Sequence, residues 1–355
     1  MAYVLSFEQI DKTSLPVVGG KNASLGEMLK SGIRVPPGFA ITTESYFEFI
    51  TSAGIADEIQ EILSHVNPDS VPSLDSSSER IQKLIMKATM PSPIKRAIMD
   101  NYAKLCDMCE IDDLPVAVRS SATAEDLPNA SFAGQQDTYL WVKGLDDVIQ
   151  NAQKCWASLF TARAIGYRVK MNFPHDKVLI SVGVQKMVNS RSSGVMFTLN
   201  PINGDPSRVV VEGSWGFGES VVSGSVTPDK FVVDKVCFEI NERIISTKTV
   251  ECVVQPSKGV VHIDVDAARQ TVPCMNDKEL VELVKIAKRI EDHYGRAMDI
   301  EWAIDHDLAF PDNVFIVQSR PETVWSQKPK ESLLGKKSGY ELLMEKALSQ
   351  IKVSN

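Results

Sequence analysis

The sequence predicts an α+β protein with two lobes, because helical patterns dominate its first part and strand patterns its second. The chain has 355 residues, which is long for one domain and short for three. With 43% hydrophobic and 24% charged residues, its composition is typical of a globular protein. We expect an N-terminal lobe over residues 1–190, a C-terminal lobe over residues 191–325, and a linker with an amphipathic tail over residues 326–355.

Apolar residues at three- and four-residue steps predict the helices of the N-terminal lobe. The predicted helices cover residues 22–31, 43–53, 78–90, 92–107 and 146–170. Proline in the first turn supports the helix that begins at residue 92. Two strands are predicted over residues 115–118 and 135–142, and the first of them carries Arg119 at its end.

The C-terminal lobe is predicted to be a mixed or antiparallel sheet, because its segments alternate or are rich in β-branched residues. Its predicted strands cover residues 193–199, 208–212, 230–235, 298–304 and 314–318, and a further predicted strand, residues 177–188, ends the N-terminal lobe. One helical pattern, residues 277–294, interrupts them.

Charge and cysteine usage exclude several classes of protein. The net charge of -8 argues against a nucleic-acid surface. No apolar run approaches the roughly 18 to 20 residues that a membrane span needs, and no signal-peptide pattern follows Met1. Six cysteines without a disulfide framework suit a reducing cytoplasm. Cys106 and Cys109 lack a second pair for zinc and lie in a predicted helix, so we interpret them as structural.

Two cations stand in settings that suit phosphate binding. Lys21 follows two glycines, which let a backbone approach phosphate closely. The Walker A spacing is absent, so this segment alone is weak evidence. Arg119 precedes Ser120, Ser121 and Thr123, which combine a planar cation with hydroxyl groups. The alternative is a surface arginine in a turn.

Asp299 and Glu301 are the strongest indication of a metal site. Side chains two apart on a strand face the same way, so both carboxylates share one face. Two such carboxylates repel unless a cation joins them, and Mg²⁺ prefers oxygen ligands. Gln318 and Arg320 repeat this spacing on the next predicted strand. The alternative is an exposed, charged face of a sheet.

A glycine-rich segment follows the predicted strand that ends at Glu212. Three glycines surround two aromatic residues between positions 213 and 218, directly before Glu219. This composition favours a close approach of backbone to a ligand. A tight bulge between strands would use the same residues.

Together these segments resemble the nucleotide-binding region of the phosphoenolpyruvate synthase and pyruvate phosphate dikinase family, a divergent ATP-grasp. The resemblance rests on residues 18–28, 118–126, 299–301 and 318–321 and covers residues 18–324. It implies a two-lobed ATP-grasp-like fold that binds ATP and Mg²⁺. It further implies that Glu301 and Gln318 bind magnesium.

The resemblance also implies the remaining ligand contacts. The segment 132–138 corresponds to a loop that closes over the phosphates, and the strand near residue 187 lies at the lobe hinge and meets the adenine. The implied nucleotide-binding residues are Lys21, Arg119, Gly134, Thr138, Gln185, Met187, Glu219, Asp299, Glu301, Gln318 and Arg320. Among them, Lys21, Arg119 and Arg320 are the implied catalytic cations.

None of the five histidines follows the Gly-Gly-x-x-Thr/Ser pattern that precedes the carrier histidine of this family. Ser64-His65 lacks the glycines, and the acceptor-binding barrel is absent from the sequence. We therefore expect an ATP-binding subunit that phosphorylates a histidine on a separate partner subunit, with AMP and phosphate formed overall.

The nucleotide subunit of phenylphosphate synthase is similar in size and domain content, which makes phenol a candidate acceptor on the partner; a pyruvate-like acceptor is the other. Two alternatives remain open. One is an excised nucleotide domain of phosphoenolpyruvate synthase or of a rifampicin phosphotransferase, and the other is a non-catalytic nucleotide-sensing module. The apolar stripe within residues 340–351 either docks a partner or packs on its own domain.

Overall fold

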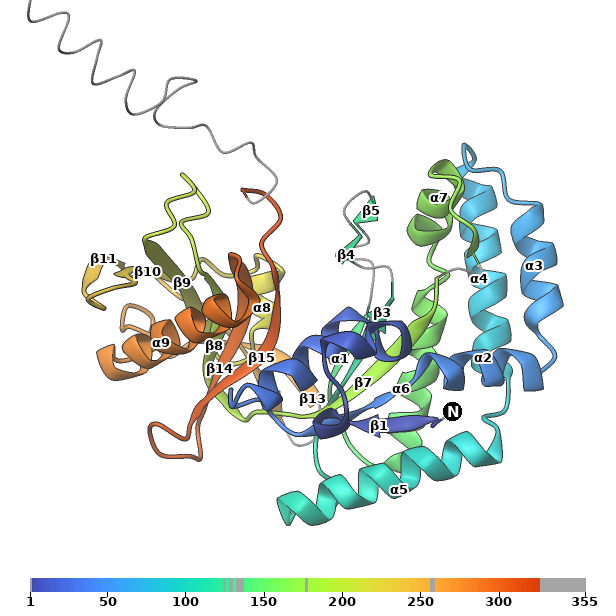
Figure 1. Cartoon of the computed structure of the whole chain (residues 1–355), viewed down its shortest axis with the longest axis horizontal. Helices are drawn as coiled ribbons and strands as arrows, with labels where there is room; N and C mark the ends of the chain where they lie inside the picture. Colours follow the sequence, from blue (N-terminus) through green and yellow to red (C-terminus); the bar gives the residue numbers. More distant parts are fainter. Residues whose placement is uncertain are drawn as a thin grey trace, which may run out of the picture. The chain divides into compact units, whose positions relative to one another are not determined.

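The computed structural model describes residues 2–123, 126–127, 130–131, 137–175, 178–255 and 259–325 (Figure 1). Contacts within the chain define two compact units, Met1–Pro321 and Glu322–Asn355. The first unit contains both large sheets. In the second, the Glu322 carboxylate accepts hydrogen bonds from the amides of Val324 and Trp325, at 2.6 and 2.9 Å.

Five strands of the first unit form an antiparallel sheet. Their order is β1 (Val4–Ser6), β2 (Gly38–Ile41), β7 (Ile180–Lys186), β3 (Val116–Ala122) and β6 (Thr138–Val142). The sequence predicted that Arg119 ends its strand, and this is wrong. β3 continues to Ala122 because residues 120–122 pair with β7, so Arg119 lies in the middle of the strand.

A second antiparallel sheet has six strands. Their order is β11 (Ile240–Ile244), β10 (Asp229–Asp234), β9 (Arg208–Trp215), β8 (Ser190–Phe197), β14 (Met298–Asp305) and β15 (Val314–Pro321). Two short ribbons pair β12 (Val250–Gln255) with β13 (Gly259–Asp264) and β4 (Asp126–Leu127) with β5 (Ala130–Ser131). The predicted α+β class with antiparallel sheets is confirmed.

The helices are α1 (Leu15–Lys30), α2 (Thr43–Ser52), α3 (Ala56–Ser64), α4 (Val71–Lys87), α5 (Ser92–Cys109), α6 (Leu145–Ser158), α7 (Ala162–Lys170), α8 (Glu219–Val222) and α9 (Asp277–Tyr294). The single helix predicted over residues 146–170 is wrong, because α6 and α7 are separate. Thr161 has extended backbone and its side chain accepts from the amide of Ala164, at 3.2 Å, which caps a new helix. Leu159 and Phe160 are buried at the break, so the apolar periodicity continues across it.

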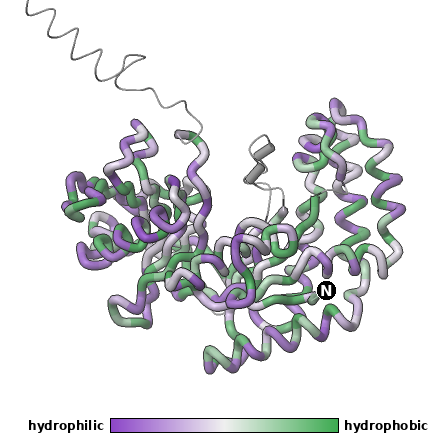
Figure 2. Tube along the Cα trace, viewed as in Figure 1, coloured by the Kyte–Doolittle hydropathy of each residue, from purple (hydrophilic) through white to green (hydrophobic). Residues whose placement is uncertain are grey.

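Each sheet has its own hydrophobic core. Helices α2, α5 and α6 cover one face of the five-stranded sheet, where Phe49 and Trp156 pack against Val182 and Val184 of β7. Along α5 hydrophobic and hydrophilic residues alternate (Figure 2), as expected of a helix with one buried face. The second core joins the six-stranded sheet to α9 and also to α1.

Helix α1 belongs to the second core although it precedes every strand of the first sheet except β1. Ala23, Leu25 and Met28 pack in that core, while the helix also contacts β3 and β7 (Figure 1). Strands of the five-stranded sheet end at Lys186, and those of the six-stranded sheet begin at Ser190. The lobe division at residue 190 remains a prediction.

Candidate functional site

A cleft of about 390 Å³ within the unit Met1–Pro321 is lined by residues from both sheets. This volume lies in the range of ligand pockets. Six of the residues singled out in the sequence line it: Arg119, Thr138, Gln185, Met187, Glu219 and Glu301. Lys21, Asp299, Gln318 and Arg320 are not in the lining. Gln318 contacts the lining residue Arg119, and the other three lie on elements next to the lining, as described below. Gly134 lies outside the described residues.

The strand pair β14–β15 brings the four predicted polar residues together. Glu301 pairs with Gln318, and Asp299 pairs with Arg320, each directly across the ladder. Ile300 is fully buried in the core on the opposite face. The alternation of side chains along a strand therefore places these residues as the sequence predicted; their roles in binding remain a prediction.

Arg119 of the five-stranded sheet reaches across the cleft to this pair. Its Nη2 donates to Glu301 Oε2 at 3.1 Å and to Gln318 Oε1 at 2.5 Å, and its Nη1 donates to the carbonyl of Val317 at 2.9 Å. A β-bulge lies here, because Glu301 pairs with Gln318 while Trp302 pairs with Ile316. The bulge leaves Val317 without a ladder partner opposite it, and its carbonyl accepts from Arg119.

The oxygens of Glu301 and Gln318 thus converge on one cationic group. A carboxylate and an amide oxygen directed at one point are suitable ligands for a hard divalent cation. In the parts of the chain that the structure describes, no group of three or more His, Cys, Asp or Glu side chains could hold a metal. A cation bound at this pair would therefore take further ligands from phosphates and water, as Mg²⁺ commonly does.

Asp299 and Arg320 form the second cross-strand pair. Arg320 donates to Asp299 Oδ2 from Nε at 2.9 Å, and its Nη2 lies 2.8 Å from the same oxygen. The Asp299 side chain is 16% exposed and that of Arg320 is 43% exposed. This pair lies two residues along the strands from Glu301 and Gln318, with the pair Ile300 and Ser319 between them.

Lys21 lies beside β3 because helix α1 kinks at Gly19. Gly19 has φ 71° and ψ 170°, a conformation that residues with a Cβ rarely adopt. A Cβ there would approach the carbonyl oxygen of Ser121 to 2.2 Å, so only glycine allows this contact. Lys21 Nζ donates to the carbonyl of Ser120 at 3.3 Å, directly after Arg119.

The end of β7 forms another wall of the cleft. Gln185 is 3% exposed, and its Nε2 donates to the carbonyl of Pro36 at 3.3 Å. The backbone of Met187 is fixed by its amide, which donates to the carbonyl of Pro115 at 2.9 Å. These hydrogen bonds tie the end of β7 to the segments that precede β2 and β3.

Glu219 begins the short helix α8 in the glycine-rich segment, and its carboxylate lies 4.0 Å from Cys252 Sγ. Burial, and after it the Glu219 carboxylate, raises the pKa of the Cys252 thiol to about 11. The thiol therefore stays protonated at neutral pH, and a protonated thiol is unreactive.

Sequence reasoning missed the apolar part of the lining. Leu140, Phe217, Trp302, Ala303 and Val317 all line the cleft. Single apolar residues look like core residues in a sequence, and nothing in their spacing marks them. Phe217 was the exception that could have been found, because the glycine-rich segment already indicated a close approach to a ligand.

A family model described as "Pyruvate phosphate dikinase, AMP/ATP-binding domain" matches residues 15–338. The chain belongs to this family. It therefore carries the AMP/ATP-binding domain of a family of ATP-dependent, dikinase-type phosphotransferases. The antiparallel α+β architecture of the described residues is consistent with the ATP-grasp-like fold that the resemblance implied.

Curated relatives of the dikinase family support this assignment. The chain is 46% identical to a probable phosphoenolpyruvate synthase of Staphylothermus marinus, over 99% of this chain and 45% of the relative. It is 44% identical to the phosphoenolpyruvate synthase of Aeropyrum pernix, over 93% of this chain and 43% of the relative. For the enzyme of Pyrococcus furiosus the identity is 42%, over 92% of this chain and 45% of the relative. The chain thus spans less than half the length of these relatives.

Among solved structures, D-alanyl-alanine synthetase A of Vibrio cholerae aligns with 68% of this chain and 62% of its own. The identity is 11% and the TM-score is 0.23, which is too low to support a structural comparison. Within the described residues, no helix combines the length and the apolar character needed to cross a membrane. All six cysteines are free.

Proposed function

We propose that the cleft binds MgATP and transfers a phosphoryl group from it to a histidine on a partner subunit. The observation that supports this proposal best is the convergence of Glu301 and Gln318 on the guanidinium of Arg119. Phosphoryl transfer depends on the positioning of charge around the transferring group. The cleft supplies a cation, a carboxylate and an amide oxygen within hydrogen-bonding distance of one another.

Glu301 and Gln318 are the residues that would hold Mg²⁺. A magnesium ion bound there would neutralise charge on the phosphates. Arg119 now donates to the same two oxygens, so it has to release them before they can bind a metal. Once released, its planar guanidinium is free to bind phosphate oxygens in a bidentate manner.

Lys21, Arg119 and Arg320 would then hold the phosphates from three separate segments. Asp299 orients Arg320, and the kink at Gly19 places Lys21 beside the strand of Arg119. We assign the base to the wall formed by Gln185 and Met187, with apolar contact from the lining residues Leu140 and Phe217. Thr138 of the lining, and Gly134, are assigned to the phosphates, and Glu219 to the nucleotide.

The acceptor histidine is proposed to come from outside the cleft. All five histidines lie in the described residues, and none of them lines the cleft. His65, at the end of α3, is near the carbonyl of Glu61, with its Nδ1 2.8 Å away. The relatives are named phosphoenolpyruvate synthases, so we propose pyruvate as the first acceptor to test on the partner and phenol as the second. The free cysteines suit the cytoplasm as the compartment.

Labelled ATP tests this function. The chain alone should bind ATP but form no acid-labile phosphoprotein from γ- or β-labelled ATP. Addition of the partner subunit should move label to that partner, with release of AMP and phosphate. Binding without transfer to any partner would favour a nucleotide-sensing module. Phosphohistidine on this chain by itself, or unaided synthesis of phosphoenolpyruvate, would refute the proposed partner.

A further inference from the structure

Side chains on opposite faces of helix α1 fasten it to both sheets. Asn22 Nδ2 donates to Ser181 Oγ of β7 at 3.1 Å. Ser24 Oγ donates to the carbonyl of Ser319 in β15 at 2.8 Å. Two residues along an α-helix correspond to a rotation of about 200°, so these contacts lie on opposite sides of the helix axis. The Asn22 backbone amide also donates to Ser121 Oγ of β3 at 3.3 Å, so the helix links β3, which carries Arg119, to β15, which carries Arg320.

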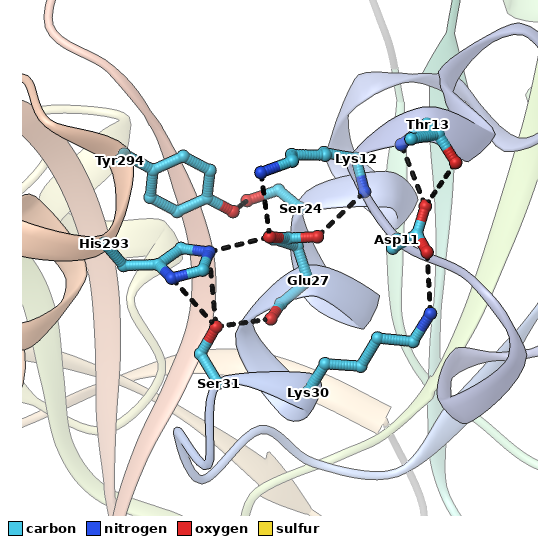
Figure 3. A network of polar contacts seen from close by, with 9 residues as sticks. All are labelled: Asp11, Lys12, Thr13, Ser24, Glu27, Lys30, Ser31, His293 and Tyr294. Carbon is cyan, nitrogen blue, oxygen red and sulfur yellow. Dashed lines mark hydrogen bonds and ion pairs between the residues drawn. The ribbon is translucent and has the colours of Figure 1, made fainter.

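Glu27 continues the face of α1 that begins with Ser24, because residues three or four apart lie one above the other. Its Oε1 lies 2.7 Å from His293 Nε2 of α9, and its Oε2 accepts from the Lys12 amide at 3.1 Å (Figure 3). Ser31 Oγ, one turn further, is 3.3 Å from both ring nitrogens of His293. Ser24 Oγ is also 3.3 Å from the hydroxyl of Tyr294, the last residue of α9.

The hydrogen bonds identify donors and acceptors in this cluster. Burial opposes ionisation of Glu27, but the Lys12 amide and His293 outweigh it and hold the pKa of this carboxyl below its usual value. Ionised Glu27 can only accept, so His293 Nε2 must donate. Ser31 Oγ donates to the carbonyl of Glu27 at 2.9 Å and can then only accept from the ring. His293 Nε2 is therefore the donor of the hydrogen bond that joins α9 to Glu27 of α1.

We propose that Glu27 and His293 form a positioning pair that fixes α1, and with it Lys21, against strand β15. Ser319, which accepts from α1, stands between Gln318 and Arg320, the proposed metal and phosphate ligands. Lys21 lies six residues before Glu27, about 9 Å along the helix axis. The pair therefore sets the position of Lys21 relative to the phosphates. This inference rests on the function proposed above.

A second ion pair of α1 provides a matched control. Lys30 Nζ lies 2.7 Å from Asp11 Oδ2, and both side chains are partly exposed (Figure 3). Asp11 precedes α1, and within the described residues neither Asp11 nor Lys30 makes a side-chain hydrogen bond or ion pair to α9 or β15. Asp11→Asn therefore removes a carboxylate that pairs with Lys30 of α1, without removing a contact between α1 and α9 or β15.

The experiment compares the affinities for ATP and adenosine by titration calorimetry in the presence of Mg²⁺. Glu27→Gln should weaken ATP binding about 10-fold and leave adenosine binding unchanged, because only the phosphates meet Lys21. In a Lys21→Ala background, Glu27→Gln should have no further effect on ATP affinity, because Glu27 acts on the phosphates only through the position of Lys21. Asp11→Asn should leave both affinities unchanged. His293→Ala should weaken ATP binding to the same extent as Glu27→Gln. It replaces Glu27→Gln in the experiment if that variant is unstable.

The outcomes separate this inference from the proposed function. Wild-type protein that does not bind ATP refutes the proposed function. If wild-type protein binds ATP and both Glu27→Gln and His293→Ala keep the wild-type ratio of ATP to adenosine affinity, the pair is only structural and the inference is wrong. An equal loss in Asp11→Asn, or a further loss in the Lys21→Ala background, overturns it as well.

Discussion

Replacing Arg119 by methionine should change metal and nucleotide binding in opposite directions. Arg119 donates to both oxygens that we assign to Mg²⁺, at 3.1 and 2.5 Å. A metal that binds the nucleotide-free protein must displace these hydrogen bonds. Arg119→Met retains the stem of the side chain and removes the competing cation, so the free protein should bind divalent metal more tightly. The same change removes a phosphate ligand, so MgATP should bind more weakly.

The magnitude follows from the exposure of the pair. A hydrogen bond to a charged group contributes about 1.5–3 kcal/mol. The side chains of Arg119 and Glu301 are 15% and 28% exposed, so solvent weakens the interaction. We take about 1–2 kcal/mol for the contact, which corresponds to roughly 5- to 30-fold tighter metal binding. Loss of a bidentate phosphate ligand should weaken MgATP by about 10-fold or more.

Manganese is a suitable probe, because free and bound Mn²⁺ are distinguished by electron paramagnetic resonance. Mn²⁺ is titrated into nucleotide-free wild type, Arg119→Met and the control Arg243→Met. Arg243 pairs with Asp277 at 2.6 Å, so its removal also frees a carboxylate, but away from the cleft. Unchanged or weaker Mn²⁺ binding in Arg119→Met, or an equal gain in the control, would refute the assignment of Glu301 and Gln318 as a metal site.

Four further outcomes are expected. Glu301→Ala should lose MgATP binding and nucleotide turnover while its circular dichroism spectrum stays that of wild type; normal turnover would remove the metal assignment. Gly19→Ala should lower the free energy of unfolding by about 3 kcal/mol, because its Cβ would meet a β3 carbonyl at 2.2 Å, and an unchanged urea midpoint would contradict this. Because the pKa of Glu27 is lowered in the folded state, its ionised carboxylate stabilises the fold at any pH above the pKa of about 4.3 in the unfolded chain. This stabilisation is lost as the pH falls through the pKa of Glu27 in the folded state. Urea unfolding should therefore separate wild type from Glu27→Gln more at pH 7 than at pH 3, and equal differences would argue against it. Iodoacetamide at pH 8 should label exposed Cys237 and spare Cys252 in native protein, as judged by mass spectrometry.

Local sequence signals predicted those elements whose ends are determined by neighbouring residues. Helix α9 has the predicted bounds, because Asn276 and Glu279 form a capping box and Gly295 ends the helix with φ 65°. The shared face of Asp299 and Glu301 was predictable for a similar reason, since the side-chain period of a strand is fixed. The separation of α6 and α7 was not, because buried residues continue through the break.

Contacts between distant segments could not be predicted from periodicity. A pattern states which face of an element is buried, and it does not state which other element covers that face. Glu27 and His293 are 266 residues apart, and neither stands in a spacing that links it to the other. The packing of α1 against the six-stranded sheet could not be predicted for the same reason, because the apolar residues of α1 could equally have faced the first sheet.

The charges on β14 and β15 show how the local pattern and the long-range contact combine. Asp299 meets Arg320 directly across the ladder, so this pair is neutralised by the sheet itself. Glu301 faces an amide instead and has no cation opposite it. A partly buried carboxylate without a partner is costly, and the structure supplies the cation from Arg119, 182 residues away in the sequence. Each of the two carboxylates therefore has its own guanidinium, one across the ladder and one across the cleft, and a metal at this face remains a prediction. We expect a bound metal to replace the cation at Glu301, because Arg119 comes from another sheet and is not part of the strand pair.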